Sequence, residues 1–285
     1  MATAAKRLTR VRQVTFGYAN LAPFIFFSLF PFYFMLVTSF KSNAELYNLK
    51  AIPFWVQSGM IGDHYSFLFQ KTEFLVWIKN SIIISVVATG ASLVIAILAG
   101  YSLARLRFRG VGSFGTAVFV TYLVPPTLLF LPLSQVVVWL GVSDSIWALI
   151  LTYPTFLVPF STWLLMGYFR TVPREIEECA LVDGASRMQT LVRIVLPMAI
   201  PGIVCAALFG FTLCWNEFIY ALTFVSQTAQ KTAVVGVTAD LIRGDIYYWG
   251  SLMAGAVLAS VPTVIFYVFF LDYYVSGLTA GAVKG

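Results

Sequence analysis

The chain has 285 residues, of which 60% are hydrophobic and only 11% are charged. Soluble domains carry roughly a quarter charged residues, so this composition excludes an ordinary soluble protein and indicates an integral membrane protein. The net charge of +6 does not predict a nucleic acid partner, because the basic residues form no patch interleaved with aromatic residues.

Six segments contain no Asp, Glu, Lys or Arg: residues 13–40, 80–104, 110–143, 145–169, 194–216 and 246–271. Each is longer than the ~20 residues that a helix needs to cross the hydrocarbon core of a membrane. A transmembrane β-barrel shows short segments of alternating polarity instead. We therefore predict an all-α polytopic membrane protein with six transmembrane helices.

Two of these segments need closer definition. Residues 110–143 are too long for one span and contain Pro125, Pro126 and Pro132, so we expect a span over about residues 113–132, followed by an interfacial segment up to residue 141. The fifth span is expected over about residues 198–225, a range that includes Glu217. The first apolar segment is too long for a signal peptide and lacks a cleavage site, which predicts a retained first helix.

The distribution of Lys and Arg predicts the orientation, because cytoplasmic segments carry an excess of both. Of the 18 basic residues, twelve lie on the side of the N-terminus and six on the other side. Both termini are therefore predicted to be cytoplasmic. The expected parts are an N-terminal tail (1–13), a transmembrane domain (14–275) with a cytoplasmic loop (170–197) and an external loop (226–249), and a C-terminal tail (276–285).

Motifs for metals and nucleotides are absent from the sequence. Cys179, Cys205 and Cys214 form no CxxC pair, and His64 is the only histidine. The pattern GxxxxGK[ST], which cradles nucleotide phosphates, does not occur. We expect this chain to bind no metal and no cofactor.

The cytoplasmic loop contains eight of the 30 ionised side chains. Pro173 suits the first turn of a helix, Gly184 can adopt the left-handed conformation that ends one, and Ser186 with Gln189 predicts a capping box for a second helix. The pattern therefore predicts a helix, a tight turn and a second helix.

Two interpretations of this loop remain open on pattern alone. It is either an amphipathic segment resting on lipid headgroups or a docking element for a soluble partner. In both cases Pro197 and Pro201 are expected to bend the second helix into the membrane.

Four motifs carry a resemblance to a known family. Glu178-Cys179-Ala180, Gly184 and Ile194-x-Leu196-Pro197 are similar in spacing to the EAA loop of ABC importer permeases, with Cys179 where alanine is usual. The segments Ala-Arg-Leu-Arg-Phe-Arg-Gly (104–110), Trp-Asn-Glu-Phe (215–218) and Gly-Leu-Thr-Ala-Gly-Ala-Val-Lys-Gly (277–285) resemble the smaller permease subunit of maltose-type carbohydrate importers. The matches cover about residues 99–285.

The resemblance implies a type I ABC importer permease in the plasma (inner) membrane of a prokaryote. Its partners would be a second homologous permease, two cytoplasmic ATPase subunits that hold ATP and Mg, an extracytoplasmic sugar-binding protein and a carbohydrate. The sugar itself is not specified. Contacts with the ATPase are implied for Glu178, Cys179, Ala180, Asp183, Gly184, Ile194, Leu196 and Pro197 in the loop, and for Gly281 and Lys284 in the tail, which by composition alone is equally a frayed C-terminus.

A candidate substrate pathway or gate is formed by Trp215, Asn216 and Glu217, because amides and carboxylates pair with sugar hydroxyls and flat rings stack on sugars. Glu217 is an acid inside an apolar segment, which favours a functional role, although a hydrogen bond between helices explains it as well. Tyr122 and Thr127 flank the prolines of the third span and are weaker candidates, since kinks are frequent in membrane helices.

Three other functions remain possible: a permease of another ABC importer class, such as one for polyamines or phosphate; a secondary transporter; and a membrane-embedded enzyme. The 215–218 and 277–285 motifs disfavour the first. A secondary transporter usually shows inverted repeats and several internal acids, and no repeat of any motif occurs here. No paired acids, Ser–His pair or metal cluster supports the enzyme. The external loop is polar enough to meet a binding protein, or is simply solvated.

Overall fold

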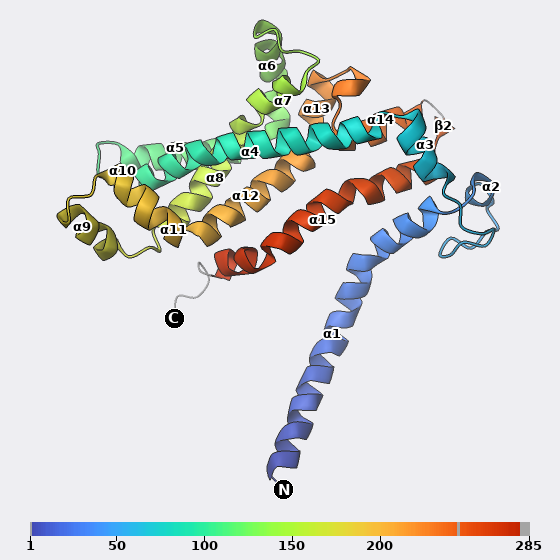
Figure 1. The fold of residues 1–285 in the computed structure, drawn as a ribbon, viewed down its shortest axis with the longest axis horizontal. Coiled ribbons are helices and arrows are strands. Elements are labelled where there is room, and N and C mark those ends of the chain that lie inside the picture. Colours follow the sequence, from blue (N-terminus) through green and yellow to red (C-terminus); the bar gives the residue numbers. More distant parts are fainter. Residues whose placement is uncertain (1, 244–245, 280–285) are drawn as a thin grey trace. The chain divides into compact units, whose positions relative to one another are not determined.

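The computed structural model describes residues 2–243 and 246–279. It divides the chain into two compact units, one formed by residues 1–72 and 241–258 and the other by residues 73–240 and 259–285. Figure 1 traces the elements of both units along the sequence. Among the described residues, all elements but one short strand pair are helical, so the all-α prediction is confirmed.

The first unit contains four helical elements and the strand pair: α1 (Ala2–Ser39), α2 (Asn43–Leu46), α3 (Asp63–Lys71), β1 (Ile242–Arg243), β2 (Ile246–Tyr247) and the beginning of α15 (Trp249–Thr279). The strands are antiparallel, with residue 242 opposite residue 247. His64 on α3 is buried and joins separate parts of this unit. Its Nε2 lies 2.9 Å from the carbonyl oxygen of Lys41, and its Nδ1 lies 3.3 Å from Oγ of Ser251.

The second unit contains the remaining elements: α4 (Phe74–Arg105), α5 (Val111–Leu123), α6 (Pro126–Trp139), α7 (Ile146–Thr152), α8 (Pro154–Phe169), α9 (Arg174–Val182), α10 (Arg187–Thr190), the π-helix η1 (Leu191–Val195), α11 (Leu196–Met198), α12 (Ile200–Trp215), α13 (Ile219–Phe224), the 3₁₀ turn η2 (Thr228–Gln230), α14 (Ala233–Asp240) and the rest of α15. Helix α4 runs beside α8 and α12 (Figure 1).

Small residues allow these helices to approach closely. A Cβ atom added at Gly100 on α4 would lie 3.2 Å from the backbone nitrogen of Met166 and 3.3 Å from the carbonyl oxygen of Thr162, both on α8. Lipid tails are as apolar as the side chains, so membrane helices associate through close packing and hydrogen bonds rather than through hydrophobic burial. Gly100 therefore sets the distance between α4 and α8.

In the part of the chain that the structure describes, four helices are long and apolar enough to span a membrane, and up to six spans result if each of two bent helix pairs counts as one. These are Gly17–Ser39, Phe74–Arg105, Val111–Leu123 with Pro126–Trp139, Ile146–Phe169, Arg187–Met198 with Ile200–Trp215, and Trp249–Tyr273. These six correspond one to one to the charge-free segments of the sequence. The bends measure 94° in the first pair and 78° in the second.

The span predicted over residues 113–132 is broken at its prolines, with a bend of 94°. Helix α5 ends at Leu123, Val124 and Pro125 are extended, and α6 starts a new direction at Pro126. The reason is local, because a residue that precedes proline is sterically disfavoured in the α conformation and two such residues follow one another here.

The predicted fifth span is also interrupted. Helix α12 ends at Trp215 and α13 begins at Ile219, so Glu217 lies in a break of the helix and not inside it. The predicted bend at Pro197 and Pro201 is confirmed, since the chain turns by 78° between α11 and α12.

A buried ion pair organises the segment between α1 and α3. Nζ of Lys41 lies 3.3 Å from Oε1 of Glu45, and it also donates to the carbonyl oxygen of Ile52 over 2.6 Å. The Glu45 carboxylate accepts hydrogen bonds from the backbone nitrogens of Gln57 and Ser58 and from the Ser58 hydroxyl. Burial raises the pKa of Glu45, but the hydrogen bonds from Ser58 and Gln57 outweigh it and lower the pKa from 4.5 to about 2.

We predict that this segment becomes less stable at low pH. A carboxylate with a lowered pKa stabilises the folded form above its ordinary pKa, and this contribution is lost as the pH falls from about 4.5 through about 2. Hydrogen-exchange protection of the Gln57 and Ser58 amides should be constant above pH 5 and fall below it. In Glu45→Gln, protection should be lower at neutral pH and independent of acid. An unchanged pH profile in that variant would contradict the assignment, and Lys50→Gln in the same segment is the control.

Candidate functional site

The loop over residues 170–197 forms the predicted helix, turn and helix. Pro173 occupies the N-cap position of α9, one place before the expected first turn, with extended backbone angles of −60° and 131°. Glu175 and Glu177 lie in the first turn, where the helix dipole favours negative charge. The sequence therefore places the start of α9 within one residue.

Gly184 forms the turn with a φ of +88°. Its N–H bonds to the carbonyl oxygen of Leu181 (3.1 Å), and the N–H of Ala185 bonds to that of Ala180 (3.0 Å). This pair of bonds is the Schellman arrangement that closes a helix. A Cβ at Gly184 would contact nothing within 4 Å, so the backbone conformation alone requires glycine.

The predicted capping box begins the second helix. The Ser186 hydroxyl accepts from the backbone N–H of Gln189 at 3.3 Å, and the Gln189 side chain accepts from the backbone N–H of Ser186 at 2.8 Å. After α10 the helix widens into the π-helix η1, where the N–H of Leu196 reaches the carbonyl oxygen of Leu191, five residues back. This widened turn precedes Pro197 and was not predicted from the sequence.

The structure separates the loop residues implied by the resemblance into two groups. Exposed or half-buried are Glu178, Cys179, Asp183, Gly184, Ile194, Leu196 and Pro197, whereas Ala180 is buried. Apolar side chains of the loop are exposed as well, since Ile176 on α9 is 40% exposed. Val182 is 86% exposed, and Met188 and Val192 are exposed as well. The loop therefore presents both charged and apolar side chains to its surroundings.

A polar cavity of about 600 Å³ lies on the inner side of α9. Four arginines, two glutamates and three apolar residues line it: Arg105, Leu106, Arg107, Phe108, Arg174, Glu177, Glu178, Leu181 and Arg187. Arg105, Arg107 and Phe108 belong to the 104–110 motif, so the fold brings this motif to the loop.

Glu217 is bound within the protein. Its carboxylate accepts hydrogen bonds from the backbone N–H groups of Tyr220 (2.9 Å) and Ala221 (3.0 Å), which lie in the first turn of α13. It also accepts one from the hydroxyl of Tyr153 (3.1 Å), the residue between α7 and α8. Acceptors at a helix N-terminus satisfy its free N–H groups. These contacts support the structural alternative, in which Glu217 holds α13 against α7 and α8.

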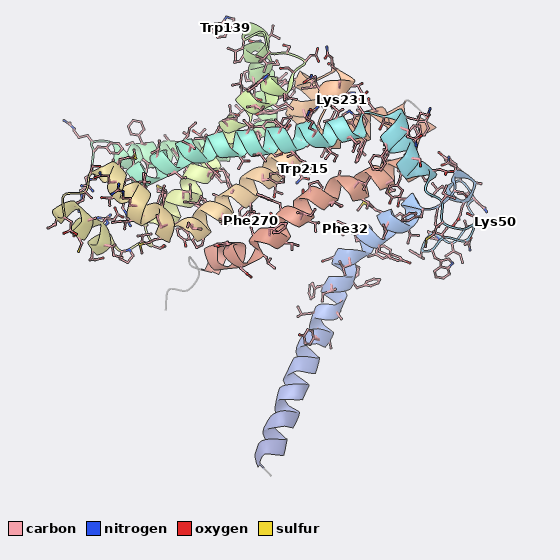
Figure 2. All side chains as sticks on the ribbon, viewed as in Figure 1. Phe32, Lys50, Trp139, Trp215, Lys231 and Phe270 are labelled. Atoms are coloured by element: carbon pink, nitrogen blue, oxygen red, sulfur yellow. The ribbon has the colours of Figure 1, made fainter. Side chains whose placement is uncertain are left out.

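Trp215 and Asn216, which precede Glu217 in the sequence, differ in exposure and in contacts. Trp215 on α12 (Figure 2) is buried and stacks on Phe211, with ring centroids 5.6 Å apart. Asn216 is exposed, and its Nδ2 donates to the carbonyl oxygen of Thr212 at 2.9 Å. The three predicted pathway residues therefore do not face one common space.

Tyr122 lines a second cavity, of about 380 Å³. Its walls are aromatic, aliphatic and hydroxylic, without a charged residue: Thr121, Tyr122, Leu123, Val124, Pro125, Pro126, Leu129, Thr155, Phe156, Phe160 and Leu213. The carbonyl oxygen of Pro126 accepts a hydrogen bond from the Tyr220 hydroxyl at 3.0 Å. Thr127 is exposed on α6 and is not among the lining residues.

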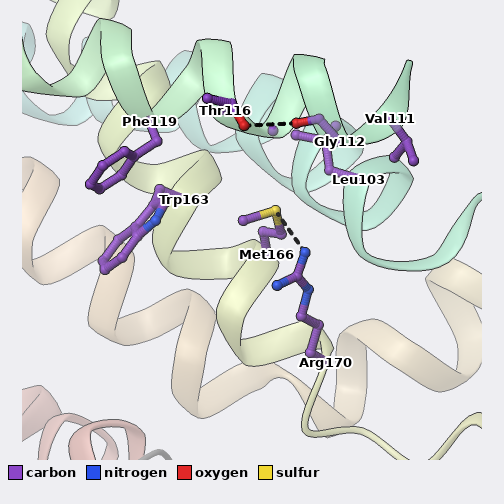
Figure 3. A pocket seen from close by; sticks show the side chains of 9 residues that line it. Leu103, Val111, Gly112, Thr116, Phe119, Trp163, Met166 and Arg170 are labelled. Carbon is purple, nitrogen blue, oxygen red and sulfur yellow. Dashed lines mark hydrogen bonds between the residues drawn. The ribbon is translucent and has the colours of Figure 1, made fainter.

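A row of rings connects this cavity to a third one along α5 and α8. Tyr122 stacks parallel to Trp163 (6.2 Å between centroids) and contacts Phe160 (5.7 Å), and Trp163 contacts Phe119 (5.9 Å). Figure 3 shows Phe119 and Trp163 facing each other at the edge of the third cavity, of about 320 Å³, which extends past Met166 to Arg170. We name Phe119, Tyr122, Phe160 and Trp163 the aromatic row.

Apart from Tyr122, the residues of the aromatic row were not predicted from the sequence. The signal was present, because Phe156, Phe160 and Trp163 recur at helical spacing on one face of α8. Aromatic residues are so frequent in this chain, at 16%, that such spacing alone did not single them out.

The external loop is folded rather than merely solvated over residues 226–240. Lys231 (Figure 2) pairs with Asp240 at 2.8 Å, and Asn80 on α4 donates to the carbonyl oxygens of Ala229 and Lys231. Four residues of α14 are buried: Ala233, Val235, Gly236 and Val237. Gly281 and Lys284, the predicted tail contacts, lie outside the described residues.

Comparisons with known proteins agree with this architecture. A family model described as "Binding-protein-dependent transport system inner membrane component" matches residues 92–279. The chain is 36% identical to the inner membrane ABC transporter permease protein YcjP of Escherichia coli over 100% of both chains. It is also 36% identical to the trehalose/maltose transport system permease protein MalG of Thermococcus litoralis, over 90% of this chain and 92% of that one.

Among solved structures, one is of a bacterial ABC transporter involved in the import of the acidic polysaccharide alginate. One of its chains matches with a TM-score of 0.77 and 20% identity, over 93% of this chain and 97% of that chain. At this identity the match shows the fold, which is that of a type I ABC importer permease.

We predict that Gly184→Ala loosens the turn of the loop. A non-glycine residue in the left-handed conformation costs about 1–2 kcal/mol, and no side-chain clash adds to this here. Hydrogen-exchange protection of the Gly184 and Ala185 amides should therefore fall about 5- to 30-fold. Gly167→Ala inside α8, where a Cβ also meets nothing within 4 Å, is the matched control and should not lose protection. Equal behaviour of the two variants would contradict the turn.

Proposed function

Since this chain belongs to the family of binding-protein-dependent transport system inner membrane components, we propose that it is the permease subunit of an ATP-driven carbohydrate importer. It is an inner membrane transport subunit, and the family works together with a binding protein. The proposed assembly contains a second homologous permease, two ATPase subunits that bind ATP and Mg, and an extracytoplasmic sugar-binding protein. This chain contributes no nucleotide site to it.

The observation that carries the coupling role is the surface of the 170–197 loop. A rigid helix, turn and helix exposes Glu178 and Asp183 next to apolar Val182 and Ile176. Exposed apolar side chains rimmed by charges are typical of protein interaction sites. A loop that only rested on headgroups would not need the Schellman turn and the capping box, which fix its shape. We therefore assign the ATPase contact to α9 and the Gly184 turn.

The carbohydrate assignment is supported by the relative named for trehalose and maltose and by the aromatic row. Pockets for uncharged ligands have apolar and aromatic walls with a few polar groups. The cavity at Tyr122 has such walls, with the hydroxyls of Thr121, Tyr122 and Thr155 as polar groups. Phosphate or polyamines would require fixed charges, and none lines this cavity. A sugar is therefore the substrate class that the chemistry favours.

The direct test is reconstitution of the chain with its second permease, ATPase and binding protein in lipid vesicles. Uptake of labelled maltose, trehalose and longer oligosaccharides is compared with uptake of phosphate and putrescine, each with and without ATP. ATP-dependent uptake of one of the sugars supports the proposal. Uptake of phosphate or putrescine alone would assign another importer class, and uptake driven by an ion gradient without ATP would assign a secondary transporter.

We predict that Glu178→Ala lowers ATP-driven uptake at least 10-fold while the complex still assembles. Glu178 is exposed, and a charged interface group often contributes about 1.5–3 kcal/mol through its hydrogen bonds. The measurement is uptake together with ATPase affinity, determined on the purified chain by titration. Glu175→Gln, exposed on the same helix, is the control. Normal uptake by the Glu178→Ala variant would contradict the assignment of the ATPase contact to α9.

We predict that Tyr122→Ala raises the KM for the sugar about 3- to 10-fold, whereas Tyr122→Phe changes it less than 2-fold. The ring stacks on Trp163, and aromatic contacts contribute about 0.5–1.5 kcal/mol beyond burial. Uptake kinetics in the reconstituted vesicles measure both variants. Phe114→Ala, an exposed ring on α5 that lines neither cavity, is the control. If all three variants behave alike, the row does not belong to the pathway.

A further inference from the structure

The 104–110 motif contains Arg105, a residue to which neither the resemblance nor the proposed function gives a role. Arg105 is the last residue of α4, a transmembrane helix, and it faces α9 of the loop. Nε of Arg105 lies 2.6 Å from Oε1 of Glu177, and the two side chains are only 4% and 5% exposed. The contact joins residues 72 positions apart.

Further bonds complete this contact. Nη2 of Arg105 donates to the carbonyl oxygen of Val172, in the connection between α8 and α9, over 2.5 Å. The hydroxyl of Tyr101, one turn earlier on α4, donates to Oε2 of Glu177 over 3.1 Å. Tyr101 also packs edge-on against Phe169, the last residue of α8. We name Tyr101, Arg105, Val172 and Glu177 the clamp.

Each part of the clamp restricts a different movement of α9. Both carboxylate oxygens of Glu177 are held, one by each α4 side chain, which fixes the rotation of α9 about its axis. The bond to Val172 fixes the segment that enters α9. The bonds from Tyr101 to Glu177 and from Arg105 to Val172 are directional hydrogen bonds, and the contact of Arg105 with Glu177 is a close ion pair. A tilt or turn of α9 relative to α4 therefore breaks at least one of these three contacts.

The energetics argue that the clamp is not simply a source of stability. A buried ion pair contributes little net stability, and its replacement by apolar residues is often neutral or stabilising. Removal of one partner, in contrast, leaves an uncompensated buried charge and is strongly destabilising. A buried pair of this kind is best explained by the geometry that it fixes.

We propose that the clamp makes α9 and the cytoplasmic end of α4 move as one body, so that displacement of the loop is transmitted directly into the membrane helix. Glu177 and Glu178 then have opposite tasks although they are neighbours. Buried Glu177 connects the loop to α4, and exposed Glu178 faces the ATPase. The transmission role rests on the proposed function, whereas the anchoring of α9 does not.

The decisive variant is Arg105→Met with Glu177→Leu. It removes both charges together, so no unpaired charge remains, and it removes all three contacts of the clamp. A merely stabilising pair predicts a double variant that unfolds at a lower temperature but holds α9 and couples its two ends as the original protein does. A positioning pair predicts a protein that assembles and stays folded but no longer couples its two ends. Arg107→Met with Glu175→Gln, two exposed residues of the same segments, is the matched control.

Two measurements separate the anchoring of α9 from transport. Cys179 on α9 is exposed, whereas Cys205 and Cys214 are buried, so a nitroxide label reports on α9 in the purified full-length chain without any partner. We expect a clearly more mobile label in the double variant than in the control. In reconstituted vesicles, we expect at least a 10-fold lower ratio of sugar transported to ATP hydrolysed, with hydrolysis continuing.

The outcomes are distinct. A wild-type label spectrum in the double variant overturns the clamp, and a mobile label with a wild-type transport ratio overturns its role in transmission. Absence of sugar uptake by the unmodified complex counts against the proposed function, while the label still tests the anchoring. If the double variant does not assemble, Arg105→Lys keeps the charge but loses the fork that reaches both Glu177 and Val172. It should mobilise the label, and an unchanged spectrum would overturn the clamp.

Discussion

Inside a membrane every backbone N–H and C=O needs a partner within the protein, and this requirement explains how the chain is able to bend. At two breaks in the second unit, a side chain bonds to the backbone beside the break. The hydroxyl of Tyr220 satisfies the carbonyl oxygen of Pro126. The carboxylate of Glu217 satisfies two N–H groups of α13. Glu217, which looks like part of a substrate pathway in the sequence, is thus a group that stabilises a change of direction between two helices.

Buried charged groups also have partners within the protein. The ion pairs Lys41–Glu45, Arg105–Glu177 and Lys231–Asp240 are all largely buried, and each lies at the end of an apolar helix or between two of them. Charged groups in such places are costly unless paired and hydrogen-bonded. The clamp therefore belongs to the region where the membrane helices meet the polar loop, while the unpaired charges of the loop, such as Glu178, remain exposed.

Local rules predicted the local structure well. The capping box of Ser186 and the left-handed turn at Gly184 depend on a few neighbouring residues, and both are confirmed. The spans predicted over residues 113–132 and 198–225, in contrast, are broken within their length. The role of Glu217 was left open between two interpretations, because its partner Tyr153 lies 64 positions earlier. The clamp and the aromatic row join separate helices, so they follow from packing and were not predictable from motifs. Residues 1–98 carried no specific motif, yet the Escherichia coli relative aligns with them as well.

The exposed apolar residues of the loop have a consequence for the life of the protein in the cell. Val182, Ile176, Met188 and Val192 are exposed in the chain by itself, and in the proposed assembly the ATPase would cover this surface. Such a surface favours aggregation, and cells remove proteins whose apolar segments stay uncovered. In the proposed assembly, the amount of permease that survives would then depend on the supply of its ATPase partner, so the two subunits would have to be synthesised in balanced amounts.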